Sequence, residues 1–241
     1  MQVVILAGGL ATRMRPLTTT IPKMMLDVAG RPFADWQLER VYDAGYRRVV
    51  LCIAHLGEQV RAHVGDGARY GLEVQYSDEG PSLRGTGGAL CHAWDLLEPS
   101  FLVTYGDSWL PFDYAEPLRT LEAHDDCDAV MSVYRNEGKL DRSNVQTDGV
   151  FVTAYEKGTV DPAFDHIDYG ALAFRKVALE PWRHEPKWDL AVAQTALAAA
   201  GRMRAVVAAE RFYEIGSPEG LQSLTYHLAA RTDLRSRKPL A

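Results

Sequence analysis

The sequence lacks several features that would assign a protein to a familiar class. Only three cysteines occur among 241 residues, and the spacing of Cys52, Cys91 and Cys127 fits no zinc site. Because 32 acidic residues outnumber 26 Lys and Arg residues, the net charge is −6 and disfavours nucleic acid or an anionic membrane as partner. No apolar run reaches membrane-spanning length, and no basic segment precedes an apolar one at the start. We therefore expect a cytoplasmic protein with free thiols.

What is present is an alternation of two hydrophobic periodicities. Continuous apolar runs predict buried strands at 3–6, 49–53, 72–76, 101–104 and 129–133. Between them, residues 34–45, 58–64, 85–97 and 114–123 are predicted to be helical, the first because Ala34, Leu38 and Val41 recur at helical spacing. Strands that alternate with helices predict an α/β fold with a largely parallel sheet and helices on both faces.

The rhythm changes after residue 134. A hairpin is predicted over 145–155 around Asp148-Gly149, followed by a strand at 169–174, a helix at 188–200, a strand at 205–209 and a helix at 218–230. We expect one domain over 1–231 with two halves, 1–134 and 135–231, the second forming a small lobe inserted between the last strands. Residues 232–241 are expected to be a frayed tail.

A loop that is rich in glycine and cations follows the first predicted strand. Gly8-Gly9 allows a sharp bend and exposes bare amides, which form an anion-binding concavity. Arg13, Arg15 and Lys23 follow closely, so the loop suits a polyphosphate. Neither common phosphate loop fits, because no Gly-Lys-Ser/Thr segment occurs here and no third glycine opens a helix. Pro16 predicts that the loop stays irregular.

Two carboxylates are predicted at the same edge of the sheet as this loop. Gly106-Asp107 follows the strand at 101–104, and ligands of such sheets bind beyond the carboxyl ends of the strands. Asp107 is therefore placed to hold Mg²⁺ against phosphate oxygens. Glu214, just before the last helix, would supply a second carboxylate. A turn or surface acid is the structural alternative for each.

Two further segments are candidates for binding. The polar loop that contains Glu79 leads into Gly85-Thr86-Gly87-Gly88, where glycines would let the chain pass close to a flat base. Lys157, after the predicted hairpin, would bind a second phosphate as a point charge. The structural alternatives are a glycine-capped loop and a solvated Glu-Lys pair.

Together these segments resemble the sugar-1-phosphate nucleotidylyltransferases. The likeness follows the family's motif order through Leu6-Ala7-Gly8-Gly9-x-x-Thr12-Arg13-x-Arg15-Pro16-Leu17-Thr18, Pro22-Lys23, Gly85-Thr86-Gly87-Gly88-Ala89, Gly106-Asp107, Glu156-Lys157 and Glu214-Ile215-Gly216-Ser217-Pro218. It implies a three-layer α/β/α, Rossmann-like fold with a mixed, mostly parallel sheet. It also implies a transferase of nucleotide-sugar biosynthesis for cell-surface polysaccharide, with a nucleotide-binding half at 1–134 and a sugar-phosphate-binding half at 135–231.

The resemblance also implies roles for the matching residues. The nucleotide would be bound by Leu6, Ala7, Gly8, Gly9, Thr12, Glu79, Gly85, Thr86 and Gly87. The catalytic set would be Arg13 and Lys23, which neutralise phosphates, and Asp107, which binds Mg²⁺ together with Glu214. The sugar phosphate would be bound by Glu156, Lys157, Asp168 and Gly170, the last two standing where the family often has Asn-x-Gly.

Three positions depart from the family's pattern. Ala11 stands where glycine is usual, so we expect the backbone there to avoid positive φ. Met24 replaces a common proline after the lysine. Glu214 replaces the aspartate of the second metal position, and its longer side chain reaches a metal only if the backbone withdraws slightly.

The implied reaction is the attack of a sugar-1-phosphate oxygen on the α-phosphorus of a nucleoside triphosphate, with pyrophosphate leaving in line. The nucleophile is already an anion, so positioning and charge neutralisation suffice without a general base. The glycine motifs resemble guanylyltransferases for mannose- or heptose-1-phosphate and favour GTP. Residues 65–72 with Tyr76-Ser77 also resemble small uridylyltransferases, including the N-acetylmuramate 1-phosphate enzyme, so UTP with a hexose or amino-sugar 1-phosphate stays open. A non-catalytic nucleotide-sugar sensor is the other alternative.

Overall fold

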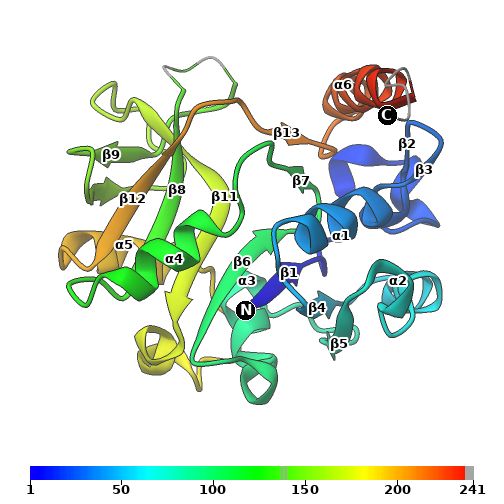
Figure 1. Cartoon of the computed structure of the whole chain (residues 1–241). Helices are drawn as coiled ribbons and strands as arrows, with labels where there is room; N and C mark the ends of the chain where they lie inside the picture. The colour runs from blue at the N-terminus through cyan, green and yellow to red at the C-terminus, as the bar shows by residue number, and fades with distance from the viewer. Residues whose placement is uncertain (137, 139, 237–241) are drawn as a thin grey trace.

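The computed structural model describes residues 1–136, 138 and 140–236 (Figure 1). Its main strands are β1 (Gln2–Leu6), β4 (Arg48–Ile53), β5 (Glu73–Asp78), β6 (Ser100–Tyr105), β8 (Ala129–Arg135), β9 (Val145–Thr147), β10 (Val152–Tyr155), β11 (His166–Arg175) and β12 (Met203–Ala208). Two-residue strands are β2 (Asp27–Val28), β3 (Arg31–Pro32), β7 (Ser108–Trp109) and β13 (Tyr213–Glu214). The α-helices are α1 (Phe33–Asp43), α2 (Gly57–Val64), α3 (Gly85–His92), α4 (Glu116–Ala123), α5 (Ala191–Ala199) and α6 (Pro218–Ser236).

In the described part of the chain the main strands form one nine-stranded mixed sheet. Its order is β10-β9-β11-β6-β1-β4-β5, with β8 beside β11 and β12 beside β8. Strands β5, β4, β1 and β6 run parallel, whereas β11 is antiparallel to both β6 and β8. This confirms the predicted α/β fold with a mixed, mostly parallel sheet. Because the second half of the chain adds β9 to β12 to the same sheet, the two halves share one framework (Figure 1).

Each predicted strand overlaps an observed strand, but several helix ends differ. The helix expected over 85–97 ends at His92, and Trp94–Leu96 tightens into a 3-10 turn. Helix α5 begins at Ala191 rather than at residue 188. Helix α6 continues to Ser236, so residues 232–236 of the expected frayed tail are helical; residues 237–241 lie outside the described residues. The two-residue strands were missed, because they are too short to show a periodicity.

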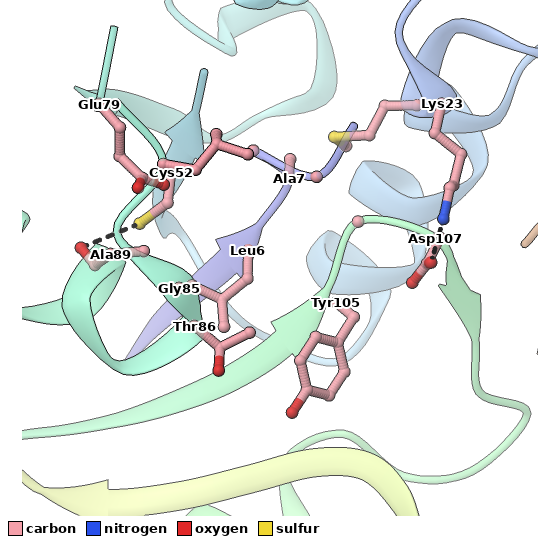
Figure 2. A pocket seen from close by; sticks show the side chains of 15 residues that line it. Leu6, Ala7, Lys23, Cys52, Glu79, Gly85, Thr86, Ala89, Tyr105 and Asp107 are labelled. Carbon is pink, nitrogen blue, oxygen red and sulfur yellow. Dashed lines mark hydrogen bonds and ion pairs between the residues drawn. The ribbon is translucent and has the colours of Figure 1, made fainter. Parts of the chain in front are cut away.

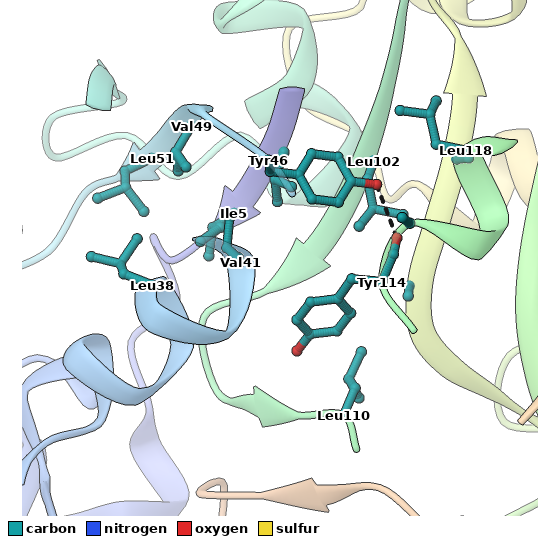
Figure 3. Close-up of a cluster of buried hydrophobic side chains, with 14 of the residues drawn as sticks. Ile5, Leu38, Val41, Tyr46, Val49, Leu51, Leu102, Leu110, Tyr114 and Leu118 are labelled. Carbon is teal, nitrogen blue, oxygen red and sulfur yellow. Dashed lines mark hydrogen bonds between the residues drawn. The ribbon is translucent and has the colours of Figure 1, made fainter. Parts of the chain in front are cut away.

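Helices cover both faces of the sheet because alternate residues of the strands point to opposite sides. Val3 and Ile5 of β1 join a cluster with side chains of α1, α2 and α4, and Val4 joins a cluster with side chains of α3 and α5. In the first cluster the Tyr46 hydroxyl donates a hydrogen bond to the Tyr114 carbonyl at 2.9 Å (Figure 3). The result is the predicted three-layer arrangement.

A third apolar cluster lies at the edge of the sheet where the first loop begins. It joins α6 to α1, to β7, to the residue after β13 and to the loop that follows β1. Its buried members include Met14, Phe33, Trp109, Ile215 and Leu224. Because segments from both ends of the chain meet in this cluster, it holds the glycine-rich loop against the strand that carries Glu214.

Candidate functional site

A cavity of about 230 Å³ opens at the carboxyl ends of the parallel strands (Figure 2). Its walls are formed by Leu6, Ala7, Gly8, Gly9, Lys23, Met24, Cys52, Glu79, Leu83, Gly85, Thr86, Ala89, Tyr105, Gly106 and Asp107. The structure therefore brings together most of the residues predicted to bind a nucleotide. Of the other predicted residues, Thr12, Arg13 and Gly87 are not in this lining, nor are Glu214 and those of the second half.

Gly8 is needed for close packing rather than for an unusual backbone conformation. A Cβ atom at Gly8 would lie 2.9 Å from Glu79 Oε1 and 3.2 Å from the Ala54 Cβ, whereas one at Gly9 would meet nothing within 4 Å. The Ala7 amide donates to the Cys52 carbonyl at 2.8 Å, which ties the start of the loop to β4. The loop is thus held against the cavity with a bare backbone facing Glu79.

The backbone at Ala11 contradicts the sequence expectation. Ala11 has φ 48° and ψ 41°, the left-handed conformation that the missing glycine would adopt easily. An alanine in this region costs on the order of 1 kcal/mol. Its carbonyl accepts hydrogen bonds from the Met14 amide at 3.0 Å and from Thr18 Oγ1 at 2.8 Å, and these bonds offset the cost. The loop keeps its conformation without glycine and, as predicted from Pro16, forms only short 3-10 turns.

Glu79 supplies a carboxylate on one wall of the cavity. The side chain is buried, burial raises its pKa, and its Oε2 accepts the Arg84 amide at 2.7 Å. Figure 2 shows Glu79 and the Lys23–Asp107 pair at opposite sides of the loop backbone. An acceptor at one side and a cation at the other suit a ligand with N–H donors at one end and phosphates at the other.

Cations and carboxylates meet at the side of the cavity opposite Glu79. Lys23 Nζ lies 2.6 Å from Asp107 Oδ2, and the two side chains are 19% and 27% exposed. Strand β13 lies antiparallel to β7 with Glu214 opposite Ser108, and the Ile215 amide donates to the Asp107 carbonyl at 2.9 Å. The two carboxylates are therefore neighbours.

The backbone of Gly216 lies close to the same charged groups. A Cβ atom at Gly216 would lie 3.5 Å from Arg13 Nη2 and 3.9 Å from both Glu214 Oε2 and Lys23 Nζ. The structure thus gathers Arg13, Lys23 and Glu214, although about two hundred residues separate Arg13 from Glu214 in the sequence. Arg15, the third cation of the loop, is exposed.

The charge balance at this side suits a divalent cation. Glu214 as a whole is exposed, but the protein atoms packed around its carboxyl and the neighbouring Asp107 carboxylate raise its pKa to about 7, while Lys23 and Arg13 act in the opposite direction. A cation between the two carboxylates would relieve their repulsion. Asp107 and Glu214 supply two carboxylates, a number that Mg²⁺ commonly takes from a protein while water and phosphate complete its shell.

The glycines of the motif at 85–88 have a packing role that the sequence did not reveal. A Cβ atom at Gly87 would lie 2.4 Å from the Trp188 ring, and one at Gly85 would lie 2.5 Å from the Trp188 carbonyl oxygen. That oxygen accepts the Gly87 amide at 3.1 Å. Gly85 and Thr86 reach the cavity, whereas Gly87 makes room for the indole.

The predicted sugar-phosphate residues lie on the second half of the sheet. Lys157 is exposed, and its Nζ is 2.5 Å from Asp189 Oδ2; Glu156 beside it is also exposed. Asp168 lies deeper, where burial raises its pKa, and accepts hydrogen bonds from Gln194 Nε2 at 2.8 Å and from the Gly170 amide at 2.9 Å.

Tyr105 links the two halves of the site and was missed at the sequence level. It lines the cavity, and a Cβ atom at Gly170 would lie 3.4 Å from its ring. Burial, with Asp168 and Asp189 nearby, raises its pKa. Its position at the end of a predicted strand, directly before Gly106, was a signal that could have found it. Asp189, which pairs with Lys157, was also missed. No signal in the sequence marked it, because its hydrogen-bond partner Thr86 is 103 residues away.

The curated relatives are nucleotide-sugar enzymes, and this chain matches each of them over only part of its length. The chain is 42% identical over 122 residues to N-acetylmuramate alpha-1-phosphate uridylyltransferase of Neisseria meningitidis, covering 50% of this chain and 52% of that protein. It is 33% identical over 179 residues to mannose-1-phosphate guanylyltransferase of Mycobacterium tuberculosis, covering 73% of this chain and 49% of that protein. The chain thus spans about half the length of these relatives.

Solved structures match over nearly the whole chain. HddC from Yersinia pseudotuberculosis, solved in complex with GMP-PN, superposes with a TM-score of 0.78 at 26% identity, over 94% of this chain and 99% of that one. A putative glucose-1-phosphate thymidylyltransferase from Bacillus anthracis shows the same fold, with a TM-score of 0.82 at 17% identity over 95% of each chain. In the described residues, no helix combines the length and the apolarity that crossing a membrane requires.

A family model described as nucleotidyl transferase matches residues 2–148, more than half of the chain. The matched segment contains the glycine-rich loop, Glu79 on one side of the cavity, and Lys23 and Asp107 on the opposite side. The chain therefore belongs to the nucleotidyl transferase family, as its motifs predicted.

Proposed function

We propose that this protein is a Mg²⁺-dependent sugar-1-phosphate nucleotidylyltransferase. It would transfer a nucleoside monophosphate from a triphosphate to a sugar 1-phosphate and release pyrophosphate. The observation that supports this most directly is the group formed by Arg13, Lys23, Asp107 and Glu214 beside the cavity of the glycine-rich loop. Residues 1–134 are assigned to the nucleotide and residues 135–231 to the sugar phosphate. Three free cysteines fit the cytoplasm as its location.

Each side of the cavity has a distinct task in this proposal. The base lies between Glu79 and Gly85, and the triphosphate extends along Gly8-Gly9 toward Lys23 and Arg13, whose charges neutralise its phosphates. Asp107 and Glu214 would hold Mg²⁺, which supplies further neutralisation of the charge on the phosphates. The two remaining residues that were predicted to bind the nucleotide, Thr12 and Gly87, support the loop and the helix that frame it.

The sugar 1-phosphate is assigned to the side where Tyr105 meets the second half. Lys157 would exchange its Asp189 partner for the phosphate, and Asp168, Gly170 and Glu156 would contact the sugar. The phosphate oxygen is already anionic, so the protein needs only to align it with the α-phosphorus and to offset the repulsion between two anions.

GTP with mannose- or heptose-1-phosphate is the substrate pair that we propose. The Glu79 carboxylate can accept both N–H groups of the guanine edge, whereas uracil offers one. The relative that covers 73% of this chain is a guanylyltransferase, and a structure at 26% identity was solved with GMP-PN. UTP with a hexose or amino-sugar 1-phosphate is the second candidate, because the relative that is 42% identical over 122 residues is a uridylyltransferase.

A pyrophosphate-release assay tests the activity and the substrates together. The protein is incubated with Mg²⁺, each of the common nucleoside triphosphates and a panel of sugar 1-phosphates. Release only with a matched pair supports the proposal, whereas nucleotide-sugar binding without release in any pair favours a sensor. Glu79→Gln tests the base assignment: it should reduce the preference for GTP over UTP about tenfold, because one acceptor is replaced by a donor.

A further inference from the structure

A buried glutamine on α1 holds the backbone that carries Asp107. Gln37 is fully buried, and its Nε2 donates hydrogen bonds to the Tyr105 carbonyl at 2.7 Å and to the Ser108 carbonyl at 3.3 Å. These two carbonyls stand on either side of Gly106-Asp107. The Gln37 side chain therefore bridges the two ends of the turn between β6 and β7 from the α1 side.

The orientation of the Gln37 amide follows from its partners. Both partners are carbonyl oxygens, which accept only, so the amide nitrogen must face them with both of its protons. Two other bonds hold the same turn: the Gly106 amide donates to the Leu6 carbonyl at 2.9 Å, and the Ile215 amide donates to the Asp107 carbonyl at 2.9 Å. Gln37 contributes the contacts from the α1 side, and without it two carbonyls at the turn lose their donors.

We propose that Gln37 is a positioning residue that sets the place of the Asp107 carboxylate for a divalent cation. It does not touch the ion itself; it acts through the backbone on both sides of Asp107. Partners that orient a metal ligand commonly change metal affinity by about ten- to a hundredfold when they are removed. The inference rests on the proposed function, because that function assigns the cation to Asp107.

A matched control lies at the opposite end of the sheet. Gln2, at the start of β1, is also buried, and its side chain likewise makes two bonds to backbone, from Nε2 to the Leu96 carbonyl at 2.8 Å and from the Glu98 amide to Oε1 at 2.9 Å. Gln37→Met and Gln2→Met each remove a buried amide of the same size. Both substitutions should lower the melting temperature, but only Gln37 contacts the backbone beside the cation site.

The test is direct binding of Mn²⁺ to the whole chain, followed by the electron paramagnetic resonance signal of the free ion. We expect Gln37→Met to raise the Kd for Mn²⁺ at least about tenfold and Gln2→Met to leave it within about twofold. If the two variants change the Kd equally, or if Gln37→Met leaves it unchanged, the inference is overturned. Gln37→His keeps one N–H donor, so it should give an intermediate Kd.

The same histidine variant decides the question if Gln37→Met does not fold. In that case a Kd above that of Gln2→Met supports the inference, and a wild-type Kd overturns it. Pyrophosphate release separates the inference from the function on which it rests. If the wild type binds Mn²⁺ and shows the Gln37 effect but releases no pyrophosphate with any substrate pair, the proposed function fails and the positioning role stands.

Discussion

Replacing Asp107 by asparagine should separate catalysis from stability. The substitution keeps the size of the side chain and removes its charge. Lys23 Nζ then loses the negative charge of its partner at 2.6 Å, and the proposed cation loses one of two neighbouring carboxylates. Because Asp107 and Lys23 are 27% and 19% exposed, the ion pair contributes no more than about 1 kcal/mol to the free energy of unfolding.

The effect of Asp107→Asn on turnover should be much larger. Loss of a metal carboxylate weakens the neutralisation of the transferring phosphate, which is worth several kcal/mol in the transition state. We expect kcat to fall about 10²- to 10³-fold, which corresponds to about 3–4 kcal/mol. Urea unfolding of the same variant should show a change of less than about 1 kcal/mol. Pyrophosphate release under saturating substrates measures the first quantity.

Asp113→Asn is the control for this experiment. Asp113 is an acid of the same size, paired with Arg119 at 2.6 Å, and does not line the cavity. Its variant should keep the wild-type kcat. If Asp107→Asn retains a rate within about threefold of wild type, Asp107 does not hold the metal and the assignment of the charged side of the cavity is wrong.

Two further predictions concern stability. Gly87→Ala places a Cβ 2.4 Å from the Trp188 ring, so urea unfolding should show a loss of about 1–3 kcal/mol, whereas Gly9→Ala, which meets nothing within 4 Å, should show almost none. Burial acts to raise the pKa of Asp35, but hydrogen bonds, led by that from Tyr70 at 2.5 Å, bring it below 3.8. This stabilisation is complete above pH 3.8 and is lost as the pH falls through the lower folded-state pKa. A plot of the free energy of unfolding against pH should therefore be flatter below pH 4 in Asp35→Asn than in the wild type. An unchanged slope would contradict the pKa shift.

The strands and most helices were readable from the chain because their signals are local. Each buried strand is a continuous apolar run, and the face that α1 buries repeats at helical spacing. The ends of helices were less certain, as the 3-10 turn at Trp94–Leu96 shows, because packing rather than propensity decides the last turn. The conformation of Ala11 was predicted wrongly for a related reason: two hydrogen bonds outweigh an intrinsic backbone preference.

The order of residues alone determined the family, the alternating architecture and the list of candidate groups, since all of these are carried by short motifs and by periodicity. Only the folded molecule decided which of those groups are neighbours. Glu214 meets Asp107 through pairing of β13 with β7, and Gln37 reaches the turn beside Asp107 from 68 residues away. Such contacts depend on the register and packing of distant segments, and no window of sequence contains them.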